Sequence, residues 1–245
     1  MPFYILSILV QVGLVVHVIK TGRNTIWIWV LVLLPGVGSL AYVLVEVLPE
    51  LFRSRATQGA MRSVRRAVDP DRDLRHASAT AAVSDTVVAK ARLGGELARR
   101  GEYAAAAATY RAGLKGIYEH DPTLLQGLAE AQFAAGDAAA ARASLDALIA
   151  NNPGFNSADG HLLYARALET EGNLVKAESE YRAVAGYYPG LEARVRHAQL
   201  LKGMGRGEEA RSALEDVLKT AELAPRHVRR AQAEWLAIAK RELGA

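Results

Sequence analysis

The sequence predicts an all-α protein, in which an N-terminal transmembrane helical hairpin precedes an α-α solenoid and a C-terminal capping helix. Three observations carry this prediction: two long apolar runs at the start, a glycine recurring about every 35 residues, and an amphipathic final stretch. The expected domains are a hairpin at 1–48, a basic juxtamembrane segment and linker at 49–84, four helical repeats at 85–225 and a capping helix at 226–245.

The first two predicted helices are apolar enough to enter a membrane. Residues 3–19 carry no charge apart from a proton on His17, and the longer run 25–47 has Glu46 as its single charge. Because about 20 apolar residues cross the hydrocarbon core of a bilayer, both runs are expected to span it. The basic start and cleavage site of a signal peptide are absent from the sequence. Two buried core helices are the disfavoured alternative, because neither run has a polar stripe.

The second run contains residues that favour a bent, closely packed helix. Trp27 and Trp29 suit the level of the lipid headgroups. Pro35 has no amide hydrogen and should kink the helix, and Gly36 and Gly38 should let the first helix approach closely.

The pattern Trp27, Pro35, Gly38 and Tyr42, which follows a short basic loop, resembles the N-terminal hairpin of cardiolipin synthases and related phospholipase D proteins. This resemblance covers about residues 5–50 and implies an anchor in a bacterial envelope. The His-x-Lys-x4-Asp signature of that family's catalytic domain is missing from the sequence, so the resemblance does not imply phospholipid synthesis.

A basic stretch follows the second apolar run. Residues 53–100 contain eleven Lys and Arg against five Asp and Glu. The positive-inside rule therefore places the C-terminal side in the cytoplasm. The stretch is either a helix on an anionic membrane surface or a solvated linker, and residues 76–84 are small and polar enough to form a hinge. The arginines assigned to the membrane surface are Arg53, Arg55, Arg62, Arg65 and Arg66.

From residue 87 onward the chain repeats. Each repeat has a glycine in the turn between two helices, and these turn glycines are Gly101, Gly136, Gly172 and Gly205. Small residues seven before and five after each glycine should bring the two backbones together. These packing residues are Gly94, Ala106, Ala129, Ala141, Ala165, Ala177, Ala198 and Ala210. The second helices of the first and fourth repeats should run slightly long, because their closing prolines come late.

This pattern of small, large and proline positions resembles the tetratricopeptide repeat. The resemblance implies a superhelix whose concave groove, lined by the first helix of each pair, binds a peptide or partner helix. The implied groove residues are Arg92, Arg99, Gln126, Glu130, Phe133, Arg166, Glu169, Gln199 and Lys202. A solvated helix surface is the competing interpretation of each. Residues 226–243 should cap the array with Val228, Ala231, Trp235, Ile238 and Ala239 on one side.

Catalysis has little support in the sequence. The absence of cysteine excludes disulfides, zinc–thiolate sites and a cysteine nucleophile. The six histidines show no metal-ligand spacing, and His161 and His197 are expected to pack inside as satisfied core residues. We therefore expect no catalytic, cofactor or metal site. Since the excess positive charge sits beside the apolar runs, we expect no nucleic-acid partner.

Together these features predict a membrane-anchored adaptor or scaffold of the bacterial inner membrane, with two passes and cytoplasmic repeats that bind a protein partner. The alternative is an accessory factor that recognises anionic phospholipid and modulates lipid or envelope biosynthesis.

Overall fold

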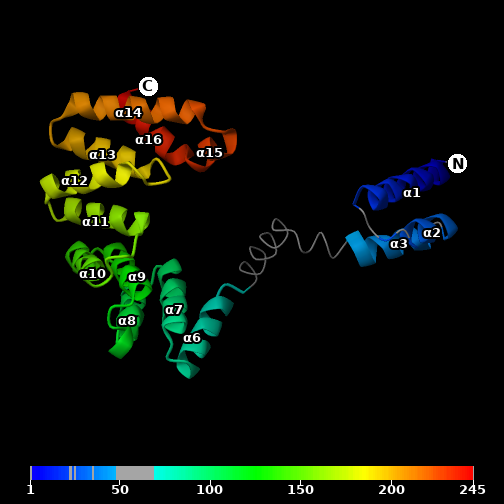
Figure 1. The fold of residues 1–245 in the computed structure, drawn as a ribbon, viewed down its shortest axis with the longest axis horizontal. Coiled ribbons are helices and arrows are strands. Elements are labelled where there is room, and N and C mark those ends of the chain that lie inside the picture. Colours follow the sequence, from blue (N-terminus) through cyan, green and yellow to red (C-terminus); the bar gives the residue numbers. More distant parts are fainter. Residues whose placement is uncertain (1, 22–23, 25, 35, 48–68, 245) are drawn as a thin grey trace. The chain divides into compact units, whose positions relative to one another are not determined.

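The computed structural model describes residues 2–21, 24, 26–34, 36–47 and 69–244, and these are helices joined by turns, without a strand (Figure 1). The all-α prediction is confirmed for this part of the chain. The described residues belong to two compact units, Met1–Arg72 and Asp73–Ala245, and each has its own core.

The first unit contains α1 (Pro2–Thr21), α2 (Ile26–Leu33), α3 (Val37–Tyr42) and the π-helix η1 (Val43–Val47). α1 packs against α2, so the two apolar runs do form a hairpin. The second run is not continuous: a helix ends at Leu33 and another begins at Val37, and Pro35, the predicted kink, lies outside the described residues. Among the helices that the structure describes, none combines the length and the apolar character needed to cross a membrane.

The core of the first unit is centred on Tyr42. Tyr42, Val18 and Leu31 are fully buried, and the Tyr42 hydroxyl lies 3.0 Å from Nδ1 of His17. The indole of Trp27 meets the Tyr42 ring edge-on at 5.3 Å and donates from Nε1 to Oε1 of Glu46 at 3.1 Å. The polar atoms of His17, Tyr42, Trp27 and Glu46 therefore contact one another within this unit.

Gly38 is a close-contact residue, but its neighbour differs from the predicted one. A Cβ on Gly38 would collide with the carbonyl oxygen of Val30, so the tight approach is between α3 and α2. A Cβ at Gly36 would meet nothing within 4 Å, and the nearest atoms to one at Gly38 belong to Val30 of α2, so the expected close approach of α1 to these two glycines is wrong.

The predicted hinge at 76–84 is also wrong, because α6 (Arg72–Val83) is a helix through most of it. Its alanines favour helix. Ser78 and Thr80 donate from their hydroxyls to the carbonyl oxygens of Arg75 and His76, at 2.9 and 2.7 Å, without interrupting it. The five arginines of the predicted membrane-surface segment lie between residues 48 and 68, outside the described residues, so their role stays a prediction.

The second unit is a succession of helix pairs (Figure 1). They are α7 (Val87–Arg99) with α8 (Tyr103–Gly113), α9 (Pro122–Ala134) with α10 (Ala138–Asn151), α11 (Ala158–Thr170) with α12 (Leu174–Ala185), and α13 (Glu192–Gly203) with α14 (Gly207–Leu223). The turn glycines Gly101, Gly136, Gly172 and Gly205 have φ values of 79°, 89°, 79° and 79°. Glycine adopts this left-handed conformation at no steric cost, which confirms the predicted turns.

Small residues line the contacts within the pairs. All eight predicted packing residues are buried. In the first pair the partner is larger than expected, because Gly94 packs against the ring of Tyr110. Gly127 of α9 packs against the same ring, and a Cβ added at Gly94 or Gly127 would lie 2.6 or 2.5 Å from it. Tyr110 therefore joins α7, α8 and α9 through two glycines.

The lengths of the second helices agree with the prediction in one repeat and not in the other. α14 has 17 residues and is long, as expected. α8 has 11 residues and ends at Gly113, followed by a 3-10 turn, η2 (Gly116–Tyr118), so the expected long helix is wrong. Gly113 lies against Leu124 and Lys90, where a Cβ would come within 2.8 and 3.3 Å, and Gly116 has a positive φ of 54°.

The capping stretch folds as two short helices, α15 (Arg226–Ala231) and α16 (Ala233–Leu243). The break at Gln232 allows its side-chain oxygen to accept the Leu191 amide hydrogen at 3.0 Å, at the start of α13. Ala239 is buried, and Trp235 and Ile238 pack on Val195 and Leu214. Val228 and Ala231 are exposed, against the prediction, because the break removes α15 from that apolar side.

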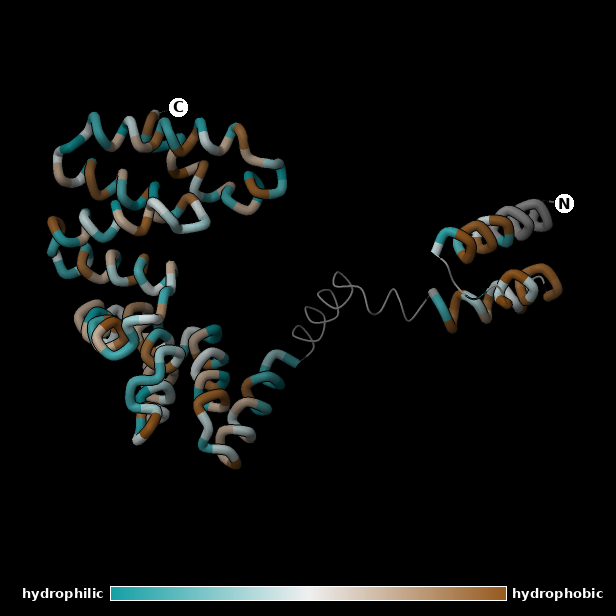
Figure 2. The backbone as a smooth tube through the Cα atoms, in the orientation of Figure 1, coloured by the Kyte–Doolittle hydropathy of each residue, from teal (hydrophilic) through white to brown (hydrophobic). Residues whose placement is uncertain are grey.

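The two units distribute apolar residues differently. In Figure 2, α2 is apolar over nearly its whole length, whereas hydrophilic and apolar residues alternate along α13 and α14. Leu33, Val37 and Leu40 of the first unit are 71%, 69% and 62% exposed. The first unit thus presents apolar side chains outward and holds its polar contacts inside.

Candidate functional site

The predicted groove residues lie on the first helices of the four pairs. We call this surface, formed by the solvent-facing sides of α7, α9, α11 and α13, the A-helix face. Four of the predicted residues are exposed: Arg92, Arg99, Glu130 and Lys202. Five are half-buried: Gln126, Phe133, Arg166, Glu169 and Gln199. The structure distributes them over four helices, and their neighbours decide which can meet a ligand.

The middle of the A-helix face carries two arginines on aromatic rings. The guanidinium carbon of Arg166 lies 4.7 Å from the ring centroid of Phe133, which connects α11 with α9. The guanidinium carbon of Arg196 lies 5.0 Å from the centroid of Trp235, which connects α13 with α16. Such cation–π contacts hold a guanidinium in place but leave its hydrogen-bond donors available.

Arg166 and Arg196 differ in their acidic partners. Arg196 donates from Nε to Oε1 of Glu192 at 2.8 Å. The guanidinium of Arg166 has neither a hydrogen bond nor an ion pair with any residue that the structure describes. Burial, and next the charge of Arg196, lower the pKa of Arg166, so a second positive charge acts on this half-buried guanidinium.

Glu169, a predicted groove residue on the same helix as Arg166, is occupied. Its Oε2 accepts the hydroxyl hydrogen of the buried Tyr181 at 2.6 Å. Burial and then this hydrogen bond raise the pKa of Tyr181. Glu169 therefore joins α11 to α12, and its charge acts on Arg166 without a direct ion pair between the two.

The last two predicted groove residues are hydrogen-bonded to the capping helix. Gln199 and Lys202 donate to the two carboxylate oxygens of Glu242 at 3.1 and 2.8 Å. The hydrogen bonds from Lys202 and Gln199 lower the pKa of Glu242. α16 thus closes this end of the A-helix face, which sequence reasoning missed because the pattern gave no position for α16 relative to α13.

At the other end, the predicted residues form local pairs. Gln126 donates to Glu130 at 2.8 Å along α9, and Arg99 pairs with Glu96 along α7. Arg92 is exposed. These contacts resemble ordinary helix-surface pairs.

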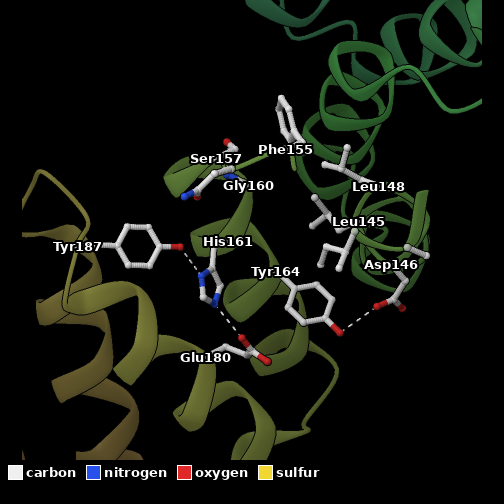
Figure 3. Close-up of a pocket in the computed structure, with 13 residues that line it drawn as sticks. Leu145, Asp146, Leu148, Phe155, Ser157, Gly160, His161, Tyr164, Glu180 and Tyr187 are labelled. Atoms are coloured by element: carbon white, nitrogen blue, oxygen red, sulfur yellow. Dashed lines mark hydrogen bonds and ion pairs between the residues drawn. The ribbon is translucent and has the colours of Figure 1, made fainter. Parts of the chain in front are cut away.

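A separate pocket of about 500 Å³ opens where α10, α11 and α12 meet (Figure 3). One wall is apolar and contains Leu145, Leu148 and Phe155. Opposite it, His161 lies between two partners: its Nδ1 is 2.5 Å from the Tyr187 hydroxyl, and its Nε2 is 2.7 Å from Oε2 of Glu180. No predicted groove residue lines this pocket.

The two histidines expected in the core have different surroundings. The His161 side chain is 25% exposed and lines the pocket, so its expected core placement is wrong. The His197 side chain is 15% exposed, and its Nε2 lies 3.0 Å from Oε1 of the buried Glu178. Burial raises the pKa of Glu178, but hydrogen bonds from His197 and Arg182 outweigh it and leave the pKa lowered.

Glu178 joins successive pairs. It lies on α12 and contacts His197 of α13 and, at 3.5 Å, Arg206 in the following turn. These contacts connect α12 with α13 and with the turn that follows α13. Within the part of the chain that the structure describes, no group of His, Asp and Glu side chains could hold a metal ion.

Comparison with solved structures identifies the fold of the second unit. This chain is similar to a structure titled "MamA RS-1 ArsTM double mutant", with a TM-score of 0.56 and 18% sequence identity. The match covers 69% of this chain and 92% of that chain. The fold is a tetratricopeptide-like helical repeat. No protein-family model matches the chain, and none of the curated proteins matches it. The likeness therefore rests on backbone arrangement and concerns the fold alone.

Proposed function

We propose that this protein is a membrane-anchored adaptor whose A-helix face binds an acidic segment of a partner protein without catalysis. The observation that carries the proposal is Arg166, a half-buried guanidinium seated on Phe133 whose donors have no acidic partner among the described residues. The charge of Arg196 also acts on Arg166, opposed by the charges of Glu192 and Glu169. The helical-repeat fold supports the proposal, because such arrays commonly present extended binding surfaces.

A carboxylate from a partner would complete this site. Arginine offers two parallel N–H donors to a carboxylate, and such charge-assisted bonds are about twice as strong as neutral ones. The ring of Phe133 has already positioned Arg166, so little side-chain entropy is lost on binding. One well-formed contact of this kind contributes about 1.5–3 kcal/mol.

The test uses the full chain in a mild detergent and a fluorescent peptide with two adjacent glutamates. Arg166→Gln is expected to weaken binding about tenfold or more, as the loss of one such contact predicts. The matched control is Arg211→Gln, at an exposed arginine of α14. Equal binding by both variants, or no binding by the unsubstituted chain, would refute an acidic partner at Arg166.

Anchoring to the membrane is the second part of the proposal. The support is the outward apolar surface of the first unit, with the Tyr42, His17 and Trp27 contacts inside it. A water-soluble unit of this size normally has the reverse arrangement. We place the anchor in a bacterial inner membrane with the repeats on the cytoplasmic side, on the basis of the arginine excess after the second apolar run.

A further inference from the structure

The pocket formed by α10, α11 and α12 is lined by acidic side chains that have no role in the adaptor proposal. Its lining includes two acids, Asp146 and Glu180, but neither lysine nor arginine. The charge of Asp146 is paired with Arg142, which lies outside the lining and donates to it at 2.7 Å, and Asp146 also accepts the Tyr164 hydroxyl hydrogen at 2.9 Å. Glu180 is hydrogen-bonded to His161 alone among the described residues.

An uncharged His161 satisfies both of its neighbours. It donates from Nε2 to Glu180 and accepts the Tyr187 hydroxyl hydrogen at Nδ1, as the distances of 2.7 and 2.5 Å allow. In this arrangement His161 carries no charge to offset that of Glu180. Lys176, a cation whose charge acts on Glu180, donates to the Tyr164 hydroxyl at 2.8 Å and does not line the pocket. Burial and then the charge of Glu180 raise the pKa of Tyr187, consistent with a negative potential in the pocket.

The pocket also offers contacts for an apolar stem. Leu145 and Leu148 form its inner wall, while Phe155, Ile149 and Tyr187 are 39%, 59% and 48% exposed at the site. Figure 3 shows Phe155 and Tyr187 on different sides of the opening, with His161 between the Tyr187 hydroxyl and Glu180. A volume of about 500 Å³ is within the usual range for sites that enclose a small ligand.

We propose that this pocket binds an arginine side chain of a partner peptide, with the guanidinium on Glu180 and the neighbouring apolar residue on the Leu145 and Leu148 wall. Arginine fits better than a purely apolar side chain, because an apolar group would desolvate the Glu180 charge and leave it with the His161 hydrogen bond and no charged partner in the pocket lining. It also stacks on aromatic rings, which the tyrosines supply. The proposal concerns residues separate from Arg166 and does not depend on the acidic-segment proposal.

The test measures binding of the dipeptide acetyl-Leu-Arg-amide to the full chain in mild detergent by saturation-transfer NMR. Binding is measured at about pH 8, above the usual titration range of histidine side chains. The neutral analogue acetyl-Leu-citrulline-amide has almost the same shape. We expect the arginine probe to bind about tenfold more tightly than the citrulline probe, as loss of one charge-assisted contact predicts.

Glu180→Gln keeps an oxygen that accepts from His161 but removes the charge. It is expected to abolish the preference for arginine while leaving citrulline binding unchanged. Glu222→Gln, at an exposed acid of α14, is the matched control and should retain the preference. Unchanged thermal melting by circular dichroism shows that the variant is folded.

Two results would overturn the pocket proposal. One is equal affinity of the unsubstituted chain for both dipeptides, including the absence of binding. The other is a preference for arginine that survives Glu180→Gln but falls in Arg166→Gln, which would place the probe on the A-helix face. Retained arginine binding in Arg166→Gln would separate this site from the acidic-segment proposal.

Discussion

Single residues decide how closely neighbouring helices of the repeat unit approach. The ring of Tyr110 occupies space that Gly94 and Gly127 leave open on either side of it. Gly94 was recognisable from its repeat register, but Gly127 was not, because it lies outside the positions that recur in the other repeats. A large residue in one repeat needs a small residue beside it to make room for its side chain, and the spacing of the repeats alone does not show where that small residue lies.

Gly94→Ala and Gly127→Ala are each expected to lower the free energy of unfolding by about 1–3 kcal/mol, because the new methyl group would overlap the Tyr110 ring. Urea unfolding followed by circular dichroism measures the loss. Gly203→Ala is the control, since a Cβ at this helical position meets open space, and it should be neutral or stabilising by up to about 1 kcal/mol. Equal effects of all three substitutions would contradict this account.

Glu178→Gln is expected to lower the free energy of unfolding by about 1–3 kcal/mol at neutral pH, because the hydrogen bonds from His197 and Arg182 lose their charged acceptor. The pKa of Glu178 is lowered in the folded chain. Its charge therefore stabilises the fold above the ordinary value of 4.5, and this contribution is lost as the pH falls through the folded-state pKa.

The gap in stability between the unsubstituted chain and Glu178→Gln should consequently close in acid. Urea unfolding at neutral and acidic pH measures it, with the exposed Glu222→Gln as a control that shows almost no gap at either pH. A gap that keeps its full size in acid would show that shape, not charge, matters at Glu178.

At the scale of elements, helix pairs were more predictable than the segments between and after them. The helix pairs could be predicted because the small contact residues and the turn glycines recur at a regular spacing. The contacts of these residues are made largely within one repeat. The break at Gln232 depends on a hydrogen bond to Leu191, 41 residues away, so no local signal marks it. For the same reason the hydrogen bonds from Gln199 and Lys202 to Glu242 were not predicted from the sequence.

Removal of α16 is expected to loosen the last pair and leave the earlier ones intact. In a chain ending at Gln232, the buried Val195, Leu214 and Val217 lose the helix that covers them. Hydrogen exchange measured by mass spectrometry should become faster in α13 and α14 and stay unchanged in α9 and α10, because stability in repeat arrays is largely a nearest-neighbour property.

Glu242→Gln serves as the milder comparison, since it weakens the contacts with Lys202 and Gln199 and keeps the apolar cover. It should leave exchange in α14 nearly unchanged. A uniform acceleration over all pairs in the shortened chain would indicate one cooperative block and contradict the nearest-neighbour account.

At the scale of the whole molecule, the two units were separable in the sequence because apolar and charged residues are segregated along the chain. Their inner contacts were less predictable. Trp27 and Tyr42 stood out as motif residues, yet their contact and the bond from Trp27 to Glu46 depend on how α2, α3 and η1 fold against one another. Similarly, Trp235 was expected only as part of the apolar side of the capping helix, and Arg196 was not among the predicted groove residues.

The chain is expected to float with neutral phosphatidylcholine vesicles, because the exposed apolar side chains of the first unit gain by leaving water. Leu33→Gln, Val37→Gln and Leu40→Gln combined should reduce partitioning more than about a hundredfold, since each such side chain contributes about 1.5–3 kcal/mol when buried. The matched control replaces Val88, Ile117 and Leu223, which are similarly exposed on the repeat unit, by Gln.

Three outcomes are informative. Flotation that the first triple variant loses and the control retains supports an apolar anchor. Failure to float on neutral vesicles contradicts it. Flotation only on anionic vesicles at low salt would favour recognition of lipid headgroups by the arginines between residues 53 and 66, the alternative function.

The left-handed turn glycines have a consequence for how such a chain changes over generations. Gly101, Gly136, Gly172 and Gly205 are 35, 36 and 33 residues apart and close equivalent turns. Duplicating or excising one whole helix pair would preserve every turn, whereas inserting a few residues inside a helix would move its small side chains off their partners. The length of this unit can therefore evolve in steps of one pair, which would add or remove a docking helix while leaving the remaining ones intact.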